Sequence, residues 1–220
     1  VANADQMAIV TAAANPEPRI GLIDRALVAA FEAGLEPLLI ITKVDLGSPQ
    51  DLLDNYSGMD LRHIEVNQQT GSGISEVRDA LSGRTTVFLG HSGVGKSTLI
   101  NKLQPDLDIN TKEVSDTHQQ GQHTTTFSEL HELDFGASII DTPGIRGFGL
   151  VELEVAELGS YFPEFFKLKS QCKFHNCIHK NEPHCAVKSA LENGEIAESR
   201  YKNYLNMLVE EEEHFRTNNY

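Results

Sequence analysis

The sequence predicts an α/β fold in which a parallel sheet is covered by helices, followed by a small, mostly helical region. Three observations predict it. Short apolar runs alternate with helix-period segments over the first half of the 220 residues. A glycine-rich loop joins one apolar run to a helical segment, and three cysteines cluster in the last third of the chain. We place the division at residue 150, which gives domains of residues 1–150 and 151–220.

Strand-like and helix-like segments alternate along the first half of the chain. Short apolar runs typical of buried strands cover residues 7–12, 37–42, 61–66 and 85–89. Apolar residues at helical spacing cover residues 20–33, 49–56 and 74–81, and the first of these segments ends at Gly34. Because strands separated by helices usually pair in parallel, this alternation indicates one parallel sheet with helices on its faces.

The pattern changes after Leu103. Residues 105–126 are polar and weakly periodic, and a loop of this length in a compact domain is usually functional. Two further strands are predicted at residues 127–133 and 137–140, and from Leu150 the chain is predicted to be helical. One apolar helix face is formed by Leu153, Ala156, Leu158, Tyr161 and Phe162, and a second by Tyr201, Tyr204, Leu205, Leu208 and Val209.

Composition limits the function classes. Hydrophobic residues make up 40% of the chain, and no apolar run approaches the roughly 18 residues that span a membrane. The formal net charge of −14 disfavours general binding to nucleic acid, whose phosphates repel an acidic surface. The first residues lack the pattern of a secretory signal, and we expect a cytoplasmic monomer without a membrane segment. The chain does not begin with Met, so we expect a fragment of a longer protein.

A phosphate-binding loop is predicted after the strand at residues 85–89. Its G-x-x-x-x-G-K-S pattern and the following threonine are supplied by Gly90, His91, Ser92, Gly93, Val94, Gly95, Lys96, Ser97 and Thr98. Glycines let the backbone curl so that N–H groups and a helix N-terminus face a phosphate. Lys96 is expected to bridge the β- and γ-phosphates, and the Ser97 hydroxyl to bind Mg²⁺. The strand–loop–helix context distinguishes this motif from a chance glycine-rich turn.

A guanine-recognition motif is predicted at the end of the strand at residues 37–42. It matches the N/T-K-x-D pattern of GTPases and consists of Thr42, Lys43, Val44 and Asp45. The Asp45 carboxylate can accept hydrogen bonds from N1–H and the 2-amino group of guanine, and adenine lacks this donor pair, which disfavours an ATPase. T-K-x-D alone is more often a solvated turn, so the phosphate loop is what favours guanine. A second base-contacting loop is expected at residues 66–71, which departs from the usual S-A-K pattern, so we expect its backbone to make the contact.

A third nucleotide motif, D-x-x-G, is matched by residues 141–144. Asp141 is expected in the Mg²⁺ shell, through water, and the Gly144 N–H at the γ-phosphate. The polar residues 116–126 are expected to form the first switch loop, with Thr124 or Thr125 reaching Mg²⁺ in the GTP-bound state.

These motifs run in an unusual order. The base motifs span residues 42–71 and the phosphate motifs residues 90–144, whereas ordinary GTPases have the reverse order. A permuted chain can build the same sheet when the original termini lie close together. The sequence therefore predicts a circularly permuted P-loop GTPase fold that binds GTP or GDP with Mg²⁺.

A metal site is predicted in the second region. Its four ligands within 14 residues are Cys172, Cys177, His179 and Cys185. Three thiolates and one imidazole suit one tetrahedral, structural Zn²⁺ per chain. An odd number of cysteines without a secretory signal argues against disulfides. His175 and His184 are rival imidazole ligands, and the alternative is that the cysteines are simply packed in a core.

The charge reverses locally around this cluster. From residue 167 to residue 188 five lysines stand against one acidic residue, Glu182; the lysines are Lys167, Lys169, Lys173, Lys180 and Lys188. Such a patch fits contact with RNA or a ribosome, and a solvated face explains it equally well.

Together the motifs resemble the RsgA (YjeQ/YloQ-type) family, the bacterial circularly permuted GTPases that act in small-ribosomal-subunit maturation. The resemblance covers nearly the whole chain and rests on residues 42–45, 90–98, 121–126, 141–144 and the cysteine–histidine spacing. It implies the small ribosomal subunit and its rRNA as partners. Family members also have an N-terminal OB-fold domain, which we expect this chain to lack, and they usually have Arg where this chain has Gln122.

Hydrolysis of GTP needs a group that orients the attacking water. Ras-like enzymes have Gln after D-x-x-G, and this chain has Ile145, which cannot bind water. The resemblance implies that a switch-loop histidine takes over, and His123 is the matching residue, with Lys96 as the other catalytic group. Arg146 is a second candidate, and an isolated loop histidine is more often simply exposed to solvent. Two function classes stay open: a GTPase stimulated by the small subunit, and a nucleotide-dependent RNA- or ribosome-binding switch with negligible intrinsic catalysis.

Overall fold

The computed structural model describes residues 3–107, 129–141 and 153–218. Their contacts divide the chain into two compact units. Unit 1 comprises Val1–Pro18, Leu35–Pro49 and Arg62–Gly147, and unit 2 comprises Arg19–Gly34, Gln50–Leu61 and Phe148–Tyr220. Such units need not coincide with domains, so the division at residue 150 stays a prediction.

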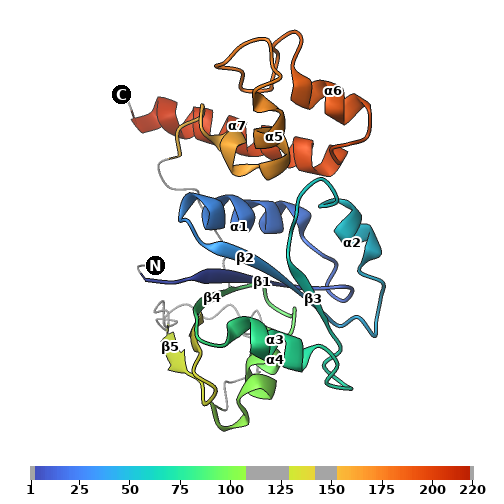
Figure 1. Cartoon of the computed structure of the whole chain (residues 1–220), viewed down its shortest axis with the longest axis vertical. Helices are drawn as coiled ribbons and strands as arrows, with labels where there is room; N and C mark the ends of the chain where they lie inside the picture. The colour runs from blue at the N-terminus through green and yellow to red at the C-terminus, as the bar shows by residue number, and fades with distance from the viewer. Residues whose placement is uncertain (1–2, 108–128, 142–152, 219–220) are drawn as a thin grey trace, which may run out of the picture. The chain divides into compact units, whose positions relative to one another are not determined.

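Unit 1 contains a six-stranded sheet with the order β3-β2-β1-β4-β6-β5 (Figure 1). Its strands are β1 (Gln6–Ala12), β2 (Glu36–Thr42), β3 (His63–Val66), β4 (Thr85–Leu89), β5 (Glu129–Glu132) and β6 (Ser138–Asp141). Every neighbouring pair is parallel except β5 with β6. The predicted parallel sheet is therefore confirmed, with one antiparallel strand at its edge.

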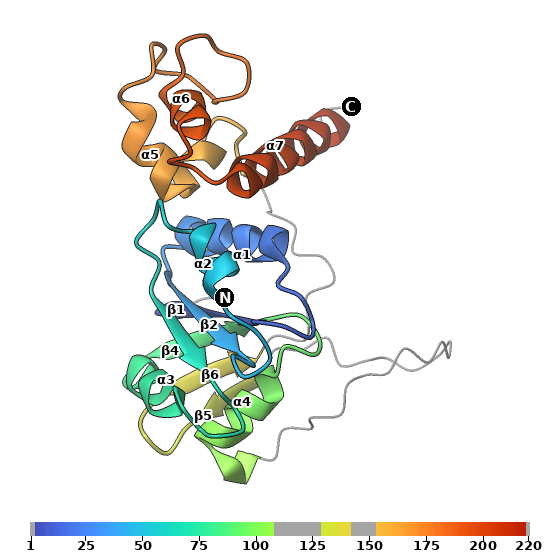
Figure 2. The same ribbon diagram turned by 90° about the vertical axis from the view of Figure 1, so that its right-hand side faces the viewer.

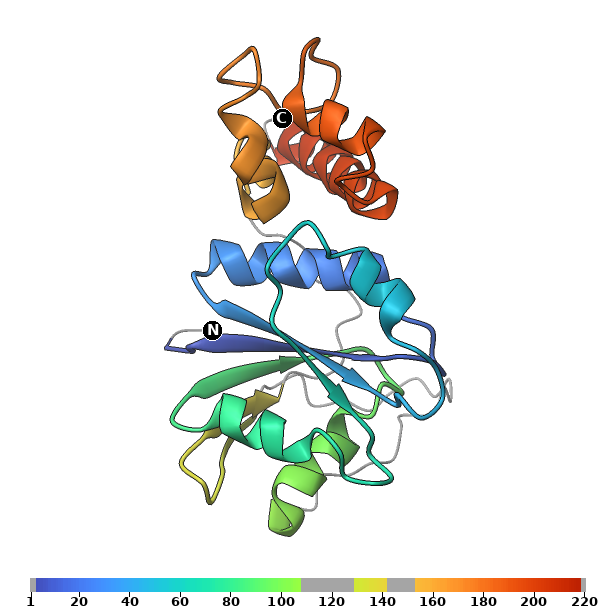
Figure 3. The same ribbon diagram turned by 45° about the vertical axis from the view of Figure 1, so that its right-hand side comes forward.

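Two helices, α3 (Ile74–Leu81) and α4 (Lys96–Leu103), lie side by side against one face of this sheet (Figure 3). The core between them joins strand residues such as Ile40 and Phe88 to Val77 and Ile100 of the helices. A short 3-10 helix, η1 (Pro105–Leu107), follows α4. This packing fixes the carboxyl ends of the parallel strands, where the predicted nucleotide motifs begin.

Unit 2 is built from helices. They are α1 (Ile20–Glu32), α2 (Gln50–Asp54), the 3-10 helix η2 (Leu158–Tyr161), α5 (Pro163–Lys169), α6 (Ala186–Glu192) and α7 (Glu198–Asn218). Figure 2 shows α7 extending away from α5 and α6. The rings of Phe162, Phe165 and Tyr204 pack on one another with centroids 5.0 to 5.3 Å apart and form the centre of its core. No helix within the described ranges is long and apolar enough to cross a membrane.

The segment before α5 differs from the sequence prediction. Residues 153–162 were expected to form one helix with a single apolar face, and they form turns followed by η2, with Ala156 exposed. Phe162 adopts an extended conformation because it precedes Pro163, whose ring disfavours the helical conformation in the residue before it. Val209, expected on the apolar face of α7, is 44% exposed.

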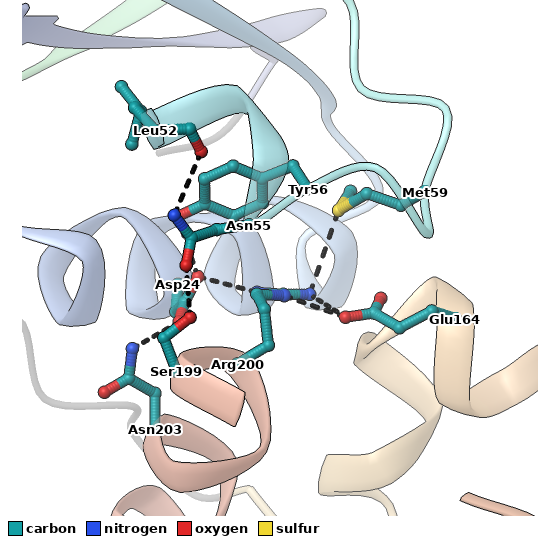
Figure 4. Close-up of polar contacts among 9 residues, drawn as sticks. All are labelled: Asp24, Leu52, Asn55, Tyr56, Met59, Glu164, Ser199, Arg200 and Asn203. Carbon is teal, nitrogen blue, oxygen red and sulfur yellow. Dashed lines mark hydrogen bonds and ion pairs between the residues drawn. The ribbon is translucent and has the colours of Figure 1, made fainter. Parts of the chain in front are cut away.

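A buried ion cluster joins four segments of unit 2 (Figure 4). The Arg200 side chain is 1% exposed and lies 2.7 Å from carboxylate oxygens of both Asp24 and Glu164. Tyr56 Oη and Asn203 Nδ2 donate further hydrogen bonds to Asp24, at 2.9 and 2.5 Å. Burial raises the pKa of Asp24, and the Arg200 guanidinium is the strongest of the groups that oppose this rise. Burial also disfavours the charged form of Arg200, but the two carboxylates outweigh it, so its pKa is raised.

Candidate nucleotide and metal sites

The phosphate-binding loop, residues 90–97, joins the end of β4 to the start of α4, as predicted. Gly93 and Gly95 have φ values of 83° and 87°. Residues other than glycine rarely adopt this left-handed backbone conformation. The loop therefore curls directly before the helix, and the N-terminus of a helix presents unpaired N–H groups and a partial positive charge to an anion.

The base motif contacts the phosphate-binding loop directly. Thr42, at the end of β2, donates its hydroxyl hydrogen to the carbonyl of Val94 at 2.5 Å. The Lys43 ammonium donates to the carbonyl of Gly93 at 2.7 Å and also to that of Asn15. Motifs 50 residues apart in the sequence thus meet at the carboxyl ends of parallel strands, where ligands of open α/β sheets bind.

The predicted specificity residue, Asp45, lies in an exposed turn. The Leu46 N–H donates to the Lys43 carbonyl at 2.9 Å and closes a turn. Asp45 lies within this turn and is exposed. Its side chain is therefore open to solvent, as contact with a nucleotide base would require.

Lys96 and Asp141 form an ion pair in this structure. Asp141 is the last residue of β6, which is the parallel neighbour of β4. The two side chains are largely buried, with 12% and 21% of their surface exposed, and the Lys96 Nζ donates to Asp141 Oδ1. The geometry brings together a lysine and an aspartate that the sequence assigned to phosphate and to Mg²⁺.

Several predicted site residues lie outside the described residues. They are His123, Thr124, Thr125 and Gly144, together with Ile145 and Arg146. Their roles stay predictions. Within the described part, sequence reasoning missed Gln68, whose side chain donates to the Gly95 carbonyl at 2.8 Å. Its loop departs from the S-A-K pattern, but nothing in the sequence indicates Gly95 as its partner.

The four predicted metal ligands converge in unit 2. The ligand atoms of Cys172, Cys177, His179 and Cys185 all lie within 4.8 Å of one another. His179 Nδ1 lies 3.7, 3.5 and 3.4 Å from the three sulfurs in chain order, and the Cys172 and Cys185 sulfurs are 4.0 Å apart. A tetrahedral Zn²⁺ with bonds of about 2.3 Å to sulfur and about 2.0 Å to nitrogen separates nitrogen from sulfur by about 3.5 Å and two sulfurs by about 3.8 Å. The donor set and its spacing therefore fit zinc.

The surroundings hold the His179 loop in place. Tyr201 Oη donates to the His179 carbonyl at 2.7 Å, and Tyr204 Oη to the Ile178 carbonyl at 2.5 Å. The Glu182 carboxylate accepts hydrogen bonds from three backbone N–H groups, those of residues 178, 180 and 181. The rival histidines, His175 and His184, are exposed and are not part of the ligand group.

Burial affects the protonation of the ligands. It raises the pKa of the Cys177 thiol to about 12, raises that of Cys185 and lowers that of His179. A neutral imidazole is the form that binds metal, and a divalent cation favours the thiolate form of cysteine. The site thus favours a bound cation over three isolated thiolates.

The geometry of the first site defines a class of protein. A P-loop at the end of one parallel strand, with a guanine motif from an earlier strand beside it, defines a P-loop nucleotide-binding protein with permuted motif order. A family model described as RsgA GTPase matches residues 1–151. The chain belongs to the RsgA GTPase family, and it is a GTPase.

Individual relatives agree with this assignment. "Small ribosomal subunit biogenesis GTPase RsgA" of Flavobacterium johnsoniae is 47% identical over 224 residues, which cover 99% of this chain and 69% of the relative. The crystal structure of YjeQ from Thermotoga maritima has a TM-score of 0.79 and 39% identity over 96% of this chain and 72% of its own. YloQ, a circularly permuted GTPase, has a TM-score of 0.76 and 32% identity, over 96% of this chain and 69% of its own. The predicted family and permuted fold are confirmed.

Proposed function

We propose that this chain hydrolyses GTP as a maturation factor of the small ribosomal subunit, and that the subunit stimulates hydrolysis. The names of its relatives support the biological role. One observation carries the chemical part: Thr42 and Lys43 bind the carbonyls of the phosphate-binding loop, so the base and phosphate motifs form one site despite their reversed order.

Each nucleotide-binding residue has a role in this proposal. Asp45 accepts two hydrogen bonds from guanine, and Lys96 binds the β- and γ-phosphates. Ser97 and Thr125 would hold Mg²⁺, and Asp141 would contribute to its shell through water. Since Lys96 and Asp141 pair with each other in this structure, nucleotide binding must separate them. Lys96 would then bind the phosphates in place of the carboxylate, and Asp141 would be free to contribute to the Mg²⁺ shell.

The remaining predicted contacts come from the two switch segments. Thr124, which precedes Thr125 in the sequence, is the alternative Mg²⁺ ligand, and the Gly144 N–H would contact the γ-phosphate. His123 orients the attacking water, since Ile145 stands where Ras-like enzymes have Gln. The subunit accelerates hydrolysis by placing His123 at the attacking water.

Zinc has a structural role in the proposal. Cys172, Cys177, His179 and Cys185 fill all four positions of a tetrahedral ion, so no position is left for substrate. The ion holds together a segment whose ligands come from turns and from the residue before α6. Metal binding to such a site contributes directly to the free energy of folding.

The lysines of the zinc segment are proposed to contact rRNA. Lys167 and Lys173 are exposed, in a stretch that is basic within an acidic chain. Charge reversal at these two lysines should weaken binding to the small subunit more at low salt than at high salt, because phosphate contacts release counterions. Unchanged binding at both salt concentrations rules out the contact.

Single-turnover hydrolysis tests the main proposal. The chain is loaded with radiolabelled GTP and Mg²⁺, and phosphate release is followed with and without purified small subunits. We expect slow hydrolysis alone and faster hydrolysis with the subunits. Equal rates in the two reactions, or competition by ATP as effective as that by GTP, contradict the proposal. Nucleotide-dependent subunit binding without turnover supports the binding-switch alternative.

A further inference from the structure

The loop that follows β3, residues 66–71, is closed by one side chain. The Asn67 side-chain oxygen accepts hydrogen bonds from the backbone N–H groups of Gln69 and Thr70, at 2.9 and 3.0 Å. The Gly71 N–H donates to the Asn67 carbonyl at 2.9 Å. Asn67 is therefore occupied in shaping the loop, and the neighbouring Gln68 side chain points elsewhere.

The Gln68 side chain reaches the phosphate-binding loop. Its Nε2 donates to the carbonyl of Gly95 at 2.8 Å, across 27 residues of sequence. The approach is close, since a Cβ atom on Gly95 would lie 2.6 Å from Gln68 Oε1. The Gly95 carbonyl also accepts the Leu99 N–H at 2.9 Å, so Gln68 occupies its second lone pair.

This contact completes a series of three. Thr42, Lys43 and Gln68 donate to the consecutive carbonyls of Val94, Gly93 and Gly95. A planar trans peptide holds its C=O and the following N–H in opposite directions, so fixing a carbonyl also fixes the direction of the next N–H. The three donors thereby fix the directions of the N–H groups of residues 94, 95 and 96. The Val94 N–H donates to the His91 carbonyl at 3.5 Å, and the N–H groups of Gly95 and Lys96, at the start of α4, are the ones that we take to face the phosphates.

We propose that Gln68 is a positioning residue for nucleotide binding: its side chain joins the second base-contacting loop to the phosphate-binding loop and helps to orient the Lys96 N–H. The inference rests on the proposed function, because it takes residues 66–71 as a base-contacting loop. It assigns a role to a side chain in this loop, for which the sequence predicts only backbone contacts with the base.

Nucleotide affinity of single variants of the whole chain tests this role. In Gln68→Ala the hydrogen bond to Gly95 is lost, and a net hydrogen bond of this kind corresponds to about a three- to tenfold rise in the Kd for GDP. Gln68→Glu should lose at least as much affinity for GDP, because a carboxylate cannot donate a hydrogen bond to a carbonyl. Gln50→Ala is the matched control: its side chain is exposed and donates to Asp54 within α2, outside the base and phosphate motifs, so the Kd of this variant for GDP should equal that of the parent.

The assay is a titration with fluorescent GDP, accompanied by the melting temperature of the nucleotide-free protein. A higher Kd for GDP in both Gln68 variants, with an unchanged melting temperature, supports the inference. A Kd equal to that of the parent overturns the inference. A higher Kd that appears only together with a lower melting temperature also overturns it, since that result indicates a structural role. If the parent itself does not bind GDP, the proposed function fails and this inference with it.

Discussion

Arg200 allows a quantitative test of the structure of unit 2. Replacing it with Met puts an unbranched apolar side chain in its place and removes the guanidinium that pairs with Asp24 and Glu164. The two carboxylates are 0% and 7% exposed, so they lose their cation without gaining water. Removing one partner of a buried ion pair typically costs about 3–5 kcal/mol, a large part of the roughly 5–15 kcal/mol that stabilises a domain. We expect Arg200→Met to lower the free energy of unfolding of unit 2 by this amount.

The composition of the chain supplies a specific probe. It has five tyrosines and no tryptophan, and all five tyrosines lie in unit 2. Tyrosine fluorescence during urea unfolding therefore reports on that unit. The matched control is Arg25→Met, because Arg25 pairs with Glu210 where 54% of the partner side chain is exposed. Exposed pairs contribute about 0–1 kcal/mol. A loss for Arg200→Met no larger than that of the control refutes the reasoning.

The loss of unfolding free energy in Arg200→Met should depend on pH. Burial raises the pKa of Asp24 and Arg200 opposes the rise, so removing Arg200 raises this pKa further. A carboxyl whose pKa is higher in the folded state holds its proton more tightly there, so the variant loses stability as the pH rises through that pKa. The destabilisation measured at about pH 5 should be smaller than that at about pH 8. The reverse order contradicts a role for the unpaired carboxylate.

Three further predictions concern the proposed sites. Asp45→Asn should shift preference from guanine toward xanthine nucleotides, because the amide donates where the carboxylate accepted; competition titrations with GDP and XDP measure this, and unchanged preference excludes Asp45 as the specificity residue. Elemental analysis should find one zinc per chain, with a lower zinc content in His179→Ala and an unchanged content in His175→Ala. Equal zinc contents in the two variants exclude His179 as a ligand. His123→Ala should reduce subunit-stimulated hydrolysis on the order of 10²-fold with GTP affinity unchanged, since the group acts only in the transition state; full stimulated turnover rejects this role.

The regular elements of unit 1 could be predicted from the sequence because their signals are local. The residue ranges of α3 and β4 agree with the prediction to the residue, and β2 differs by one residue at its start. The metal ligands were also predictable, since their spacing within 14 residues is itself the signal.

Contacts between distant residues could not be predicted in the same way. Gln68 and Gly95 are polar and small residues in two separate loops, and their hydrogen bond follows from the strand order. Arg200 lies in an amphipathic helix where charged residues normally face solvent. Its burial follows from two acidic residues, Asp24 and Glu164, that are 176 and 36 residues away.

The separation between Asp24 and Arg200 also sets an order of events during protein synthesis. A ribosome adds about 5–20 residues per second, so the 176 residues that separate the pair take about 9–35 s to appear. Throughout that interval Asp24 has no guanidinium partner, and the first two segments of unit 2 lack the C-terminal segment against which they pack. The first helix of unit 2, α1, is synthesised before β2 of unit 1. The nascent chain can nevertheless complete the sheet of unit 1 before it completes unit 2. Unit 2 is therefore completed late in synthesis although one of its helices is made early.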